Sequence, residues 1–198
     1  MSTAIRAAAI AIAGICLVAC GGAGTSSPGT SPSAAGASNP AATSSPSSGT
    51  AAAAAMALTV ADLPTGGPTL AQISDGEMNS IANTDQRGFA NTDNTYRIED
   101  DVVIDASSQA ATADYTQLRD AAKDQVVTLA SSSMLSGLGS QADEYIGETS
   151  NGYSEVGITF QEGSVIAVLL IVDSSGTVDP TFAEAVAGVQ DQKIVAAS

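Results

Sequence analysis

The residues that most often carry catalysis are scarce in this chain. It has 198 residues, with no His, no Trp and two Cys. Without His, neither a Ser-His-Asp nor a Cys-His nucleophile can be assembled, and every metal site that depends on imidazole is excluded. Two Cys are too few for a zinc site built on Cys alone or for a disulfide framework. Any chemistry must therefore come from carboxylates, hydroxyls and a small number of basic side chains.

Several of the carboxylates lie close together between residues 93 and 105. They are Asp93, Glu99, Asp100, Asp101 and Asp105. Carboxylate oxygens are ligands that Ca²⁺ prefers, and extracellular modules bind this ion weakly. No stretch matches the EF-hand loop, with its central Gly and terminal Glu. We interpret the segment as a solvated bend between strands and predict no metal site, while a cation site over 93–105 stays open as the alternative.

Arg119 and Lys123 form the one cluster of positive charge after residue 58. On a helix they would lie one turn apart, where they could together hold an anionic group. Asp120 and Asp124 occupy the same turn. We favour pairing with these acidic neighbours on an exposed face over an anion site, since exposed charges mostly serve solvation.

Residues 137–142 read GLGSQA and formally fit the dinucleotide fingerprint G-x-G-x-x-A. That fingerprint binds a pyrophosphate only when a strand precedes it and a helix follows. Here the pattern predicts a helix before it and a strand after it. No S-x-x-K motif occurs either, and no pair of carboxylates stands in an apolar setting. We predict a protein that is not an enzyme and uses no cofactor.

The charge of the chain excludes one class of partner. Six basic and 21 acidic residues give a formal net charge of −15 at pH 7, and every acidic residue lies at or after Asp62. Nucleic acids are bound mainly through Lys and Arg contacts to phosphate. We therefore expect no nucleic-acid partner.

Four segments after residue 58 have the composition of β-strands, namely 96–104, 143–148, 153–160 and 165–172. An Asn-Gly and a Glu-Gly pair separate the last three, and such pairs favour the tight turns of antiparallel hairpins. The last segment is apolar throughout, which fits a central strand buried on both faces. A short strand is also predicted over 70–73. The polar stretch 74–94 is predicted to be a long loop, with at most a weak strand near 88–91.

Apolar residues step by three and four along residues 111–129, which predicts a helix. They are Ala111, Tyr115, Leu118, Ala122, Val126 and Leu129. Residues 131–139 are predicted to be a flexible connection. Asp179 followed by Pro180 marks the start of a second helix, because Asp caps a helix and Pro fits its first turn. This order predicts an α+β fold, in which two helices pack on one face of a mainly antiparallel sheet as a two-layer sandwich.

The first 20 residues have the pattern of an export signal. Arg6 precedes an apolar run over 7–18 that is too short to cross a bilayer, which takes about 20 residues. The following Leu17-Val18-Ala19-Cys20-Gly21 resembles the lipobox of bacterial lipoproteins. The resemblance implies that the Cys20 thiol is diacylglycerated and that the signal peptide 1–19 is removed. An ordinary signal peptide with an incidental Cys and an uncleaved short anchor are the alternatives.

Residues 20–57 would then connect the acyl anchor to the fold. No charged residue occurs from 21 to 57, and Gly, Ser, Thr, Ala and Pro make up nearly all of this stretch. Such a composition buries too little apolar surface to offset the entropy of ordering. We predict a disordered linker over 20–57, whose glycosylation stays open, and an α+β domain over 58–198.

The domain also resembles the small α+β domains of actinobacterial cell-envelope lipoproteins, some of them PsbP-like. The opening LTVADLP over 58–64 is similar to a start seen in these proteins, and so is Gly137-Leu138-Gly139 followed by Ala142. Ser140 and Gln141 stand where an acidic pair is more usual. The resemblance implies an envelope location and binding of a ligand or protein, with no functional residue to transfer.

We therefore expect a lipoprotein anchored to the membrane through Cys20 on its extracytoplasmic face and acting as a non-enzymatic binding module. Its partner would be a small apolar molecule or another envelope protein. Tyr145 and Tyr153 flank the Asn-Gly turn and are the aromatic side chains expected to line a groove. The alternatives are an interaction lipoprotein without a small ligand and, less favoured, a carboxylate-based hydrolase. The sequence predicts neither the ligand nor the oligomeric state.

Overall fold

The computed structural model describes residues 48–78 and 81–198. The expected signal peptide, Cys20 and most of the expected linker lie outside these residues. The described strands are β1 (Ala71–Gly76), β2 (Thr84–Ala90), β3 (Tyr96–Ile104), β4 (Thr128–Met134), β5 (Gln141–Glu148), β6 (Ser154–Glu162) and β7 (Val165–Asp173). The helices are α1 (Ser48–Met56), α2 (Ser108–Lys123) and α3 (Pro180–Ala197), with a short 3₁₀ turn at Val60–Asp62. Within this part of the chain, no helix combines the length and apolar character needed to cross a bilayer.

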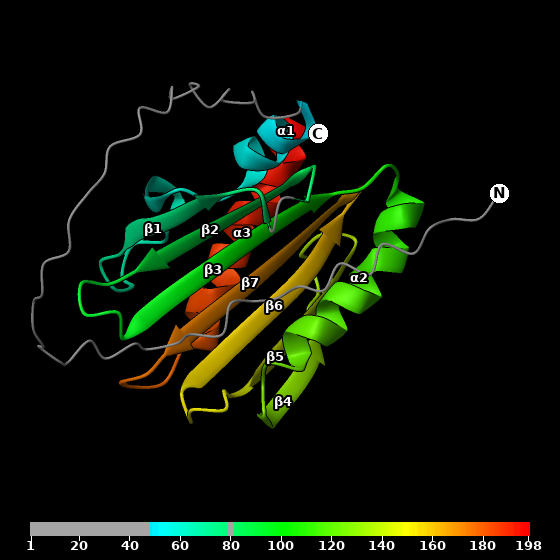
Figure 1. The fold of residues 1–198 in the computed structure, drawn as a ribbon. Coiled ribbons are helices and arrows are strands. Elements are labelled where there is room, and N and C mark those ends of the chain that lie inside the picture. Colours follow the sequence, from blue (N-terminus) through cyan, green and yellow to red (C-terminus); the bar gives the residue numbers. More distant parts are fainter. Residues whose placement is uncertain (1–47, 79–80) are drawn as a thin grey trace, which may run out of the picture. The chain divides into compact units, whose positions relative to one another are not determined.

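The strands form one antiparallel sheet in the order β1-β2-β3-β7-β6-β5-β4 (Figure 1). The apolar strand β7 lies at its centre between β3 and β6, as its composition predicts. The predicted strands 143–148, 153–160 and 165–172 and the two hairpin turns between them are confirmed. Residues 96–104 are also a strand, but the bend or tight hairpin expected at 99–101 is wrong, because β3 pairs with β7 without interruption. The α+β class and the antiparallel sheet are confirmed with them.

Two segments that lack an apolar pattern are strands as well. The predicted loop 74–94 contains β2 and the second half of β1, and β2 is largely buried. Most of strand β2 was not predicted, because it buries polar side chains, among them Arg87 and Asp85, which pair with each other at 2.9 Å inside the fold. The predicted flexible connection 131–139 is wrong over its first part, since Thr128–Met134 forms the edge strand β4. Every residue of β4 is exposed, so no hydrophobic alternation marks it.

The helices lie on both faces of the sheet, so the predicted two-layer sandwich is not what the structure shows. Side chains alternate along β6: Ile158 and Phe160 belong to the core under α1 and α3, whereas Thr159 and Gln161 face α2. Figure 1 shows α3 behind the sheet and α2 in front of it. The sequence pattern marks which face of each helix is buried, but not which face of the sheet it covers.

Part of the expected linker is folded into this core. The polyalanine run forms α1, and Ala53, Met56, Ala57 and Leu58 are buried. Small side chains let this helix lie close to the sheet. Arg87 holds its end, because its guanidinium donates to the carbonyl oxygens of Ala54 and Leu58, each at 2.7 Å. The folded unit thus begins before residue 58.

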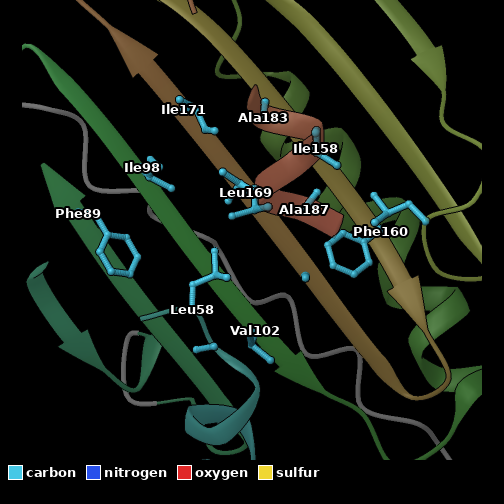
Figure 2. Packing of buried hydrophobic residues seen from close by; sticks show 14 of the residues in the cluster. Leu58, Phe89, Ile98, Val102, Ile158, Phe160, Leu169, Ile171, Ala183 and Ala187 are labelled. Carbon is cyan, nitrogen blue, oxygen red and sulfur yellow. The ribbon is translucent and has the colours of Figure 1, made fainter. Parts of the chain in front are cut away.

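The hydrophobic core fills the space between the sheet and the helices α1 and α3. Figure 2 shows Phe89, Ile98, Leu169 and Ile158 on four neighbouring strands, with Ala187 of α3 lying against them. These side chains are almost fully buried. The core covers one face of the sheet, and a group of buried polar residues lies on the opposite face.

Candidate functional site

The acidic segment 93–105 is not a solvated bend. It crosses the middle of the sheet as β3, and alternation along the strand sends Asp100 to one face and Glu99 and Asp101 to the other. Asp93 lies in the turn before β3, where it accepts hydrogen bonds from Thr95. The five acids therefore do not converge. Among residues 48–78 and 81–198, no group of three or more acidic or Cys side chains is placed to hold a metal ion.

Asp100 belongs to the core on the α1 and α3 side. It is 0% exposed, and its Oδ2 accepts a hydrogen bond of 2.6 Å from the backbone N–H of Leu58. Its Oδ1 accepts from Gln190 Nε2 of α3. Burial raises the pKa of Asp100 to about 7, against the lowering effect of these hydrogen bonds. This carboxyl joins the segment after α1, the sheet and α3, and its role is structural.

The face toward α2 holds polar groups of a different kind. Asp101 Oδ1, Tyr145 Oη, Glu155 Oε1 and Thr159 Oγ1 are buried and have no hydrogen-bond partner in the described part of the chain. Their residues are between 0% and 2% exposed. Glu99, on the same face of β3 as Asp101, is half-buried. We call these five residues the carboxylate basin.

The strand register shows how the basin is built. Glu99 lies opposite Leu170, which lies opposite Gly157, and Asp101 lies opposite Val168, which lies opposite Thr159. The basin thus has one bank on β3, a floor of apolar β7 residues and a second bank on β6.

Tyr145 reaches this second bank from β5 because Gly157 has no side chain. A Cβ at Gly157 would lie 1.8 Å from Tyr145 Cε2 and 2.5 Å from Tyr145 Oη, so the phenol covers this glycine. Its hydroxyl lies on the same face of β6 as Glu155 and Thr159, which stand two residues to either side of Gly157. A glycine at this position is therefore part of the site.

The acids of the basin are held in an environment that disfavours charge. Burial and the nearby Glu99 together raise the pKa of Asp101 to about 8. Burial, with Glu99 again, raises the pKa of Glu155 to about 7. The pKa of Glu99 is also raised by burial, although Arg97 opposes this. Burial raises the pKa of Tyr145, the neighbouring Thr159 hydroxyl lowers it, and the charges of Glu155 and Asp101 raise it.

A second feature lies beside the basin, where α2 passes the β4–β5 edge. It is an open pocket of about 240 Å³, which we call the α2 pocket. Its lining residues are Arg119, Asp120, Lys123, Ser132, Asp143 and Tyr145. Tyr145 belongs to both features, but the expected groove lined by Tyr145 and Tyr153 together is not formed by this pocket. Tyr153 is not part of the lining.

The cations of the α2 pocket are not both available to an anion. Arg119 pairs with Asp120 at 2.7 Å, as expected, and its Nη1 lies 3.6 Å from Asp143 Oδ2. Asp143 also accepts a 2.8 Å hydrogen bond from the hydroxyl of Tyr115. Lys123 makes no ion pair within the described ranges. With two cations and two carboxylates in its lining, the pocket has no net charge to select an anion.

The glycine motif at 137–142 is a turn. It joins strand β4 to strand β5, so the helix that a dinucleotide site requires after the motif is missing from this position. Gly139 has φ of 52°, and a Cβ there would lie 2.3 Å from the carbonyl oxygen of Gln161. Gly139 therefore lets the backbone of this turn lie close to the backbone of Gln161 in β6.

Sequence reasoning marked Tyr145 but missed Asp101, Glu155 and Thr159 as members of one site. A signal was present, because Glu155 and Thr159 are polar residues inside a strand whose other face is strongly apolar. Their shared parity with Gly157 places all three on one face of β6. What the sequence does not contain is the register that brings β3 and β5 beside them.

Comparison with known proteins identifies a fold and no family. No family model and no curated protein matches the chain. The structure is similar to the extracellular domain of PknH from Mycobacterium tuberculosis, with a TM-score of 0.52 and 9% sequence identity. The similarity covers 77% of this chain and 98% of that domain. The two proteins share an α+β fold, and the PsbP-like resemblance stays a prediction.

Proposed function

We propose that this chain is an extracytoplasmic, membrane-anchored binding module without enzymatic activity, and that its ligand site is the carboxylate basin. The location is supported by the resemblance of residues 1–20 to an export signal, by the resemblance of residues 17–21 to a lipobox, and by a fold shared with an extracellular domain. The observation that carries the binding role is the group of unpaired polar atoms in the basin.

Unpaired buried polar atoms are destabilising. Each buried donor or acceptor without a partner costs about 1–3 kcal/mol, and natural folds contain few of them. Here four lie on one face of the sheet, on β3, β5 and β6, and the buried Nε of Arg97 on the same face also has no partner in the described residues. A ligand that supplies the missing partners would recover this free energy on binding.

The same groups are poorly suited to acid–base catalysis. A carboxylate pair that works as acid and base needs one raised pKa and one ionised partner. In the basin, burial raises the pKa of all three carboxyls, Glu99, Asp101 and Glu155. This common shift favours a binding site over the alternative of a carboxylate hydrolase.

The test is native mass spectrometry of the full chain, extracted in mild detergent from its own cell envelope. We expect a bound small molecule on the wild type that is missing from Glu155→Gln. Glu144→Gln is the matched control, because Glu144 is also a buried glutamate with an unpaired Oε1, and it lies on the other face of the sheet. A wild-type mass with no ligand would contradict the proposal.

That outcome would favour the second candidate, an interaction lipoprotein. Its supporting observation is the edge strand β4, which carries no charge and exposes Leu129 and Met134. An exposed, uncharged edge can accept a strand from a partner protein. Substituting Lys at Ser131, in the middle of β4, should then abolish partner binding and leave the fold intact.

A further inference from the structure

The carboxylate basin has a chemistry that limits what can bind there. Two of its four unpaired atoms are carboxylate oxygens, and the other two are hydroxyl oxygens. Glu99 adds a third carboxylate on the β3 bank. Ionised carboxylates only accept hydrogen bonds, so a ligand that donates several of them and carries positive charge would satisfy these atoms and favour the ionised form of the acids.

The spacing of the banks does not favour a bare metal ion. The β3 and β6 banks are separated by β7, and two strand spacings amount to about 9–10 Å between backbones. Calcium needs oxygen ligands at about 2.3–2.6 Å from the ion, so one ion would contact both banks only if their side chains leaned toward each other over β7. This agrees with the absence of a metal-binding group among the residues that the structure describes.

The floor of the basin is apolar. Val168 and Leu170 of β7 lie between the banks, opposite Asp101 and Glu99. Methylene groups lying on this floor would remain away from water, while charged ends would meet the carboxylates on either side. A cation that suits the basin is therefore charged at both ends and aliphatic between them.

We propose that the carboxylate basin binds an aliphatic diamine or polyamine, with one ammonium group on each bank. This inference rests on the binding function proposed above and names its ligand class. One end would lie between Glu99 and Asp101 of β3. The other would lie at Glu155, beside the hydroxyls of Tyr145 and Thr159. From the strand spacing, about four to six methylene groups separate the two nitrogens.

The remaining charges around the basin are compatible with this ligand. Arg97 of β3 lies on the same face, opposite Val172, which in turn lies opposite Glu155. The basin is therefore surrounded by three carboxyl groups and one cationic side chain. Arg97, Glu99 and Val172 are only half-buried, so the ligand can enter from this side. An ammonium group beside each carboxylate would favour its ionised form and so reverse the effect of burial.

The experiment is calorimetric titration of the full chain, in nonionic detergent at physiological salt, with 1,4-diaminobutane and 1,6-diaminohexane. Hexylamine and 1,6-hexanediol are the ligand controls, since they keep one charge or none. We expect the diamines to bind at least about tenfold more tightly than hexylamine, because the second ammonium adds a charge-assisted hydrogen bond. The diol should not bind.

The variants test whether binding occurs at the basin. Glu155→Gln and Asp101→Asn each neutralise one bank, and each should weaken diamine binding by about tenfold or more. Glu144→Gln removes the same charge from the opposite face and should change affinity less than about twofold. Circular dichroism verifies that each variant is folded. Equal binding by all four proteins would mean non-specific attraction to an acidic protein and would overturn the proposal.

Failure of the ligand class can be distinguished from failure of the binding function. If the envelope-derived protein carries a neutral or anionic molecule that Glu155→Gln loses, while the diamines do not bind, the basin is a binding site and the diamine inference is wrong. If the wild type carries no ligand and the diamines do not bind, both proposals are wrong.

Discussion

Asp100 allows a sharp test of the electrostatics of this fold, because its replacement by Asn preserves shape. Its carboxyl accepts from the Leu58 N–H at 2.6 Å and from Gln190 Nε2. Gln190 Oε1 is buried and has no partner among the described residues. In Asp100→Asn, Oδ1 can still accept from Leu58, and the new Nδ2 can donate to Gln190 Oε1 once that amide rotates by half a turn. The two hydrogen bonds of this position are then kept without a buried charge, and after the rotation Gln190 Nε2 replaces Oε1 as the buried atom without a partner among the described residues.

The magnitude follows from the pKa of Asp100, which burial raises from 3.8 to about 7. A raised carboxyl pKa means that the protonated form is favoured in the fold, so its contribution is fully present below pH 3.8. It is lost as pH rises toward 7. At about 1.4 kcal/mol per pKa unit, the wild type should lose roughly 2–3 kcal/mol from this group between pH 5 and pH 8. Asp100→Asn should not lose that part.

The assay is urea unfolding of wild type and Asp100→Asn at pH 5, 6, 7 and 8. The stability difference should change steadily in favour of the variant as pH rises. Glu148→Gln removes the same charge from an exposed position and should follow the wild type. If wild type and Asp100→Asn lose equal stability between pH 5 and pH 8, Asp100 does not ionise against a burial penalty and the reasoning fails.

Three further perturbations test the fold, the site and the anchor. Arg87→Lys should lower the free energy of unfolding by about 2 kcal/mol in urea titrations, because one ammonium group cannot reach Asp85 and the carbonyls of both Ala54 and Leu58. An unchanged unfolding midpoint would contradict this role. Gly157→Ala should lower the free energy of unfolding by about 1–3 kcal/mol and change tyrosine fluorescence, since its Cβ would lie 1.8 Å from the Tyr145 ring. If neither stability nor fluorescence changed, the Tyr145 ring would not lie over Gly157. Cys20→Ala should move the protein from the membrane fraction to the soluble fraction in high salt, and continued membrane association would refute the acyl anchor.

The parts of the fold that the sequence predicts are those where one face of a strand is apolar. Residues 96–104 and 153–160 alternate in this way, and β7 is apolar on both faces, so the centre of the sheet was predictable. The edges were not. Strand β4 is exposed along its whole length, and β2 buries Asp85 with its partner Arg87, so neither carries an apolar period.

The helix α1 was missed for a different reason. Its alanines have little apolar surface, so composition suggests a linker. The helix is stabilised from a distance, by Arg87 on its terminal carbonyls and by the pairing of Asp100 with Leu58 just after it. Such long-range polar contacts leave no local pattern in the sequence.

The site was predictable only in its parts. Tyr145 was singled out because aromatic residues are scarce, and Glu99 and Asp101 because acids are clustered there. Period-two alternation already separates Asp100 from these two acids, so a single shared cation site over 93–105 was never compatible with a strand. Bringing Glu155 and Thr159 to the same surface needs the β3-β7-β6 order, which depends on long-range pairing.

Adjacent carboxyls on β3 separate the requirements of the fold from those of function. Asp100 and Asp101 are both buried and both have a raised pKa, but Asp100 accepts two hydrogen bonds while Asp101 Oδ1 has none from any described residue. Asp100→Asn should therefore be more stable than wild type at pH 8 and should bind ligand equally well. Asp101→Asn should also gain stability at pH 8, because its ionised form is disfavoured by burial, yet it should lose ligand binding. Unfolding and titration of the two variants side by side test this difference. If Asp101→Asn kept full binding, Asp101 Oδ1 would be an unsatisfied atom with no role in binding, and the basin would not be the ligand site.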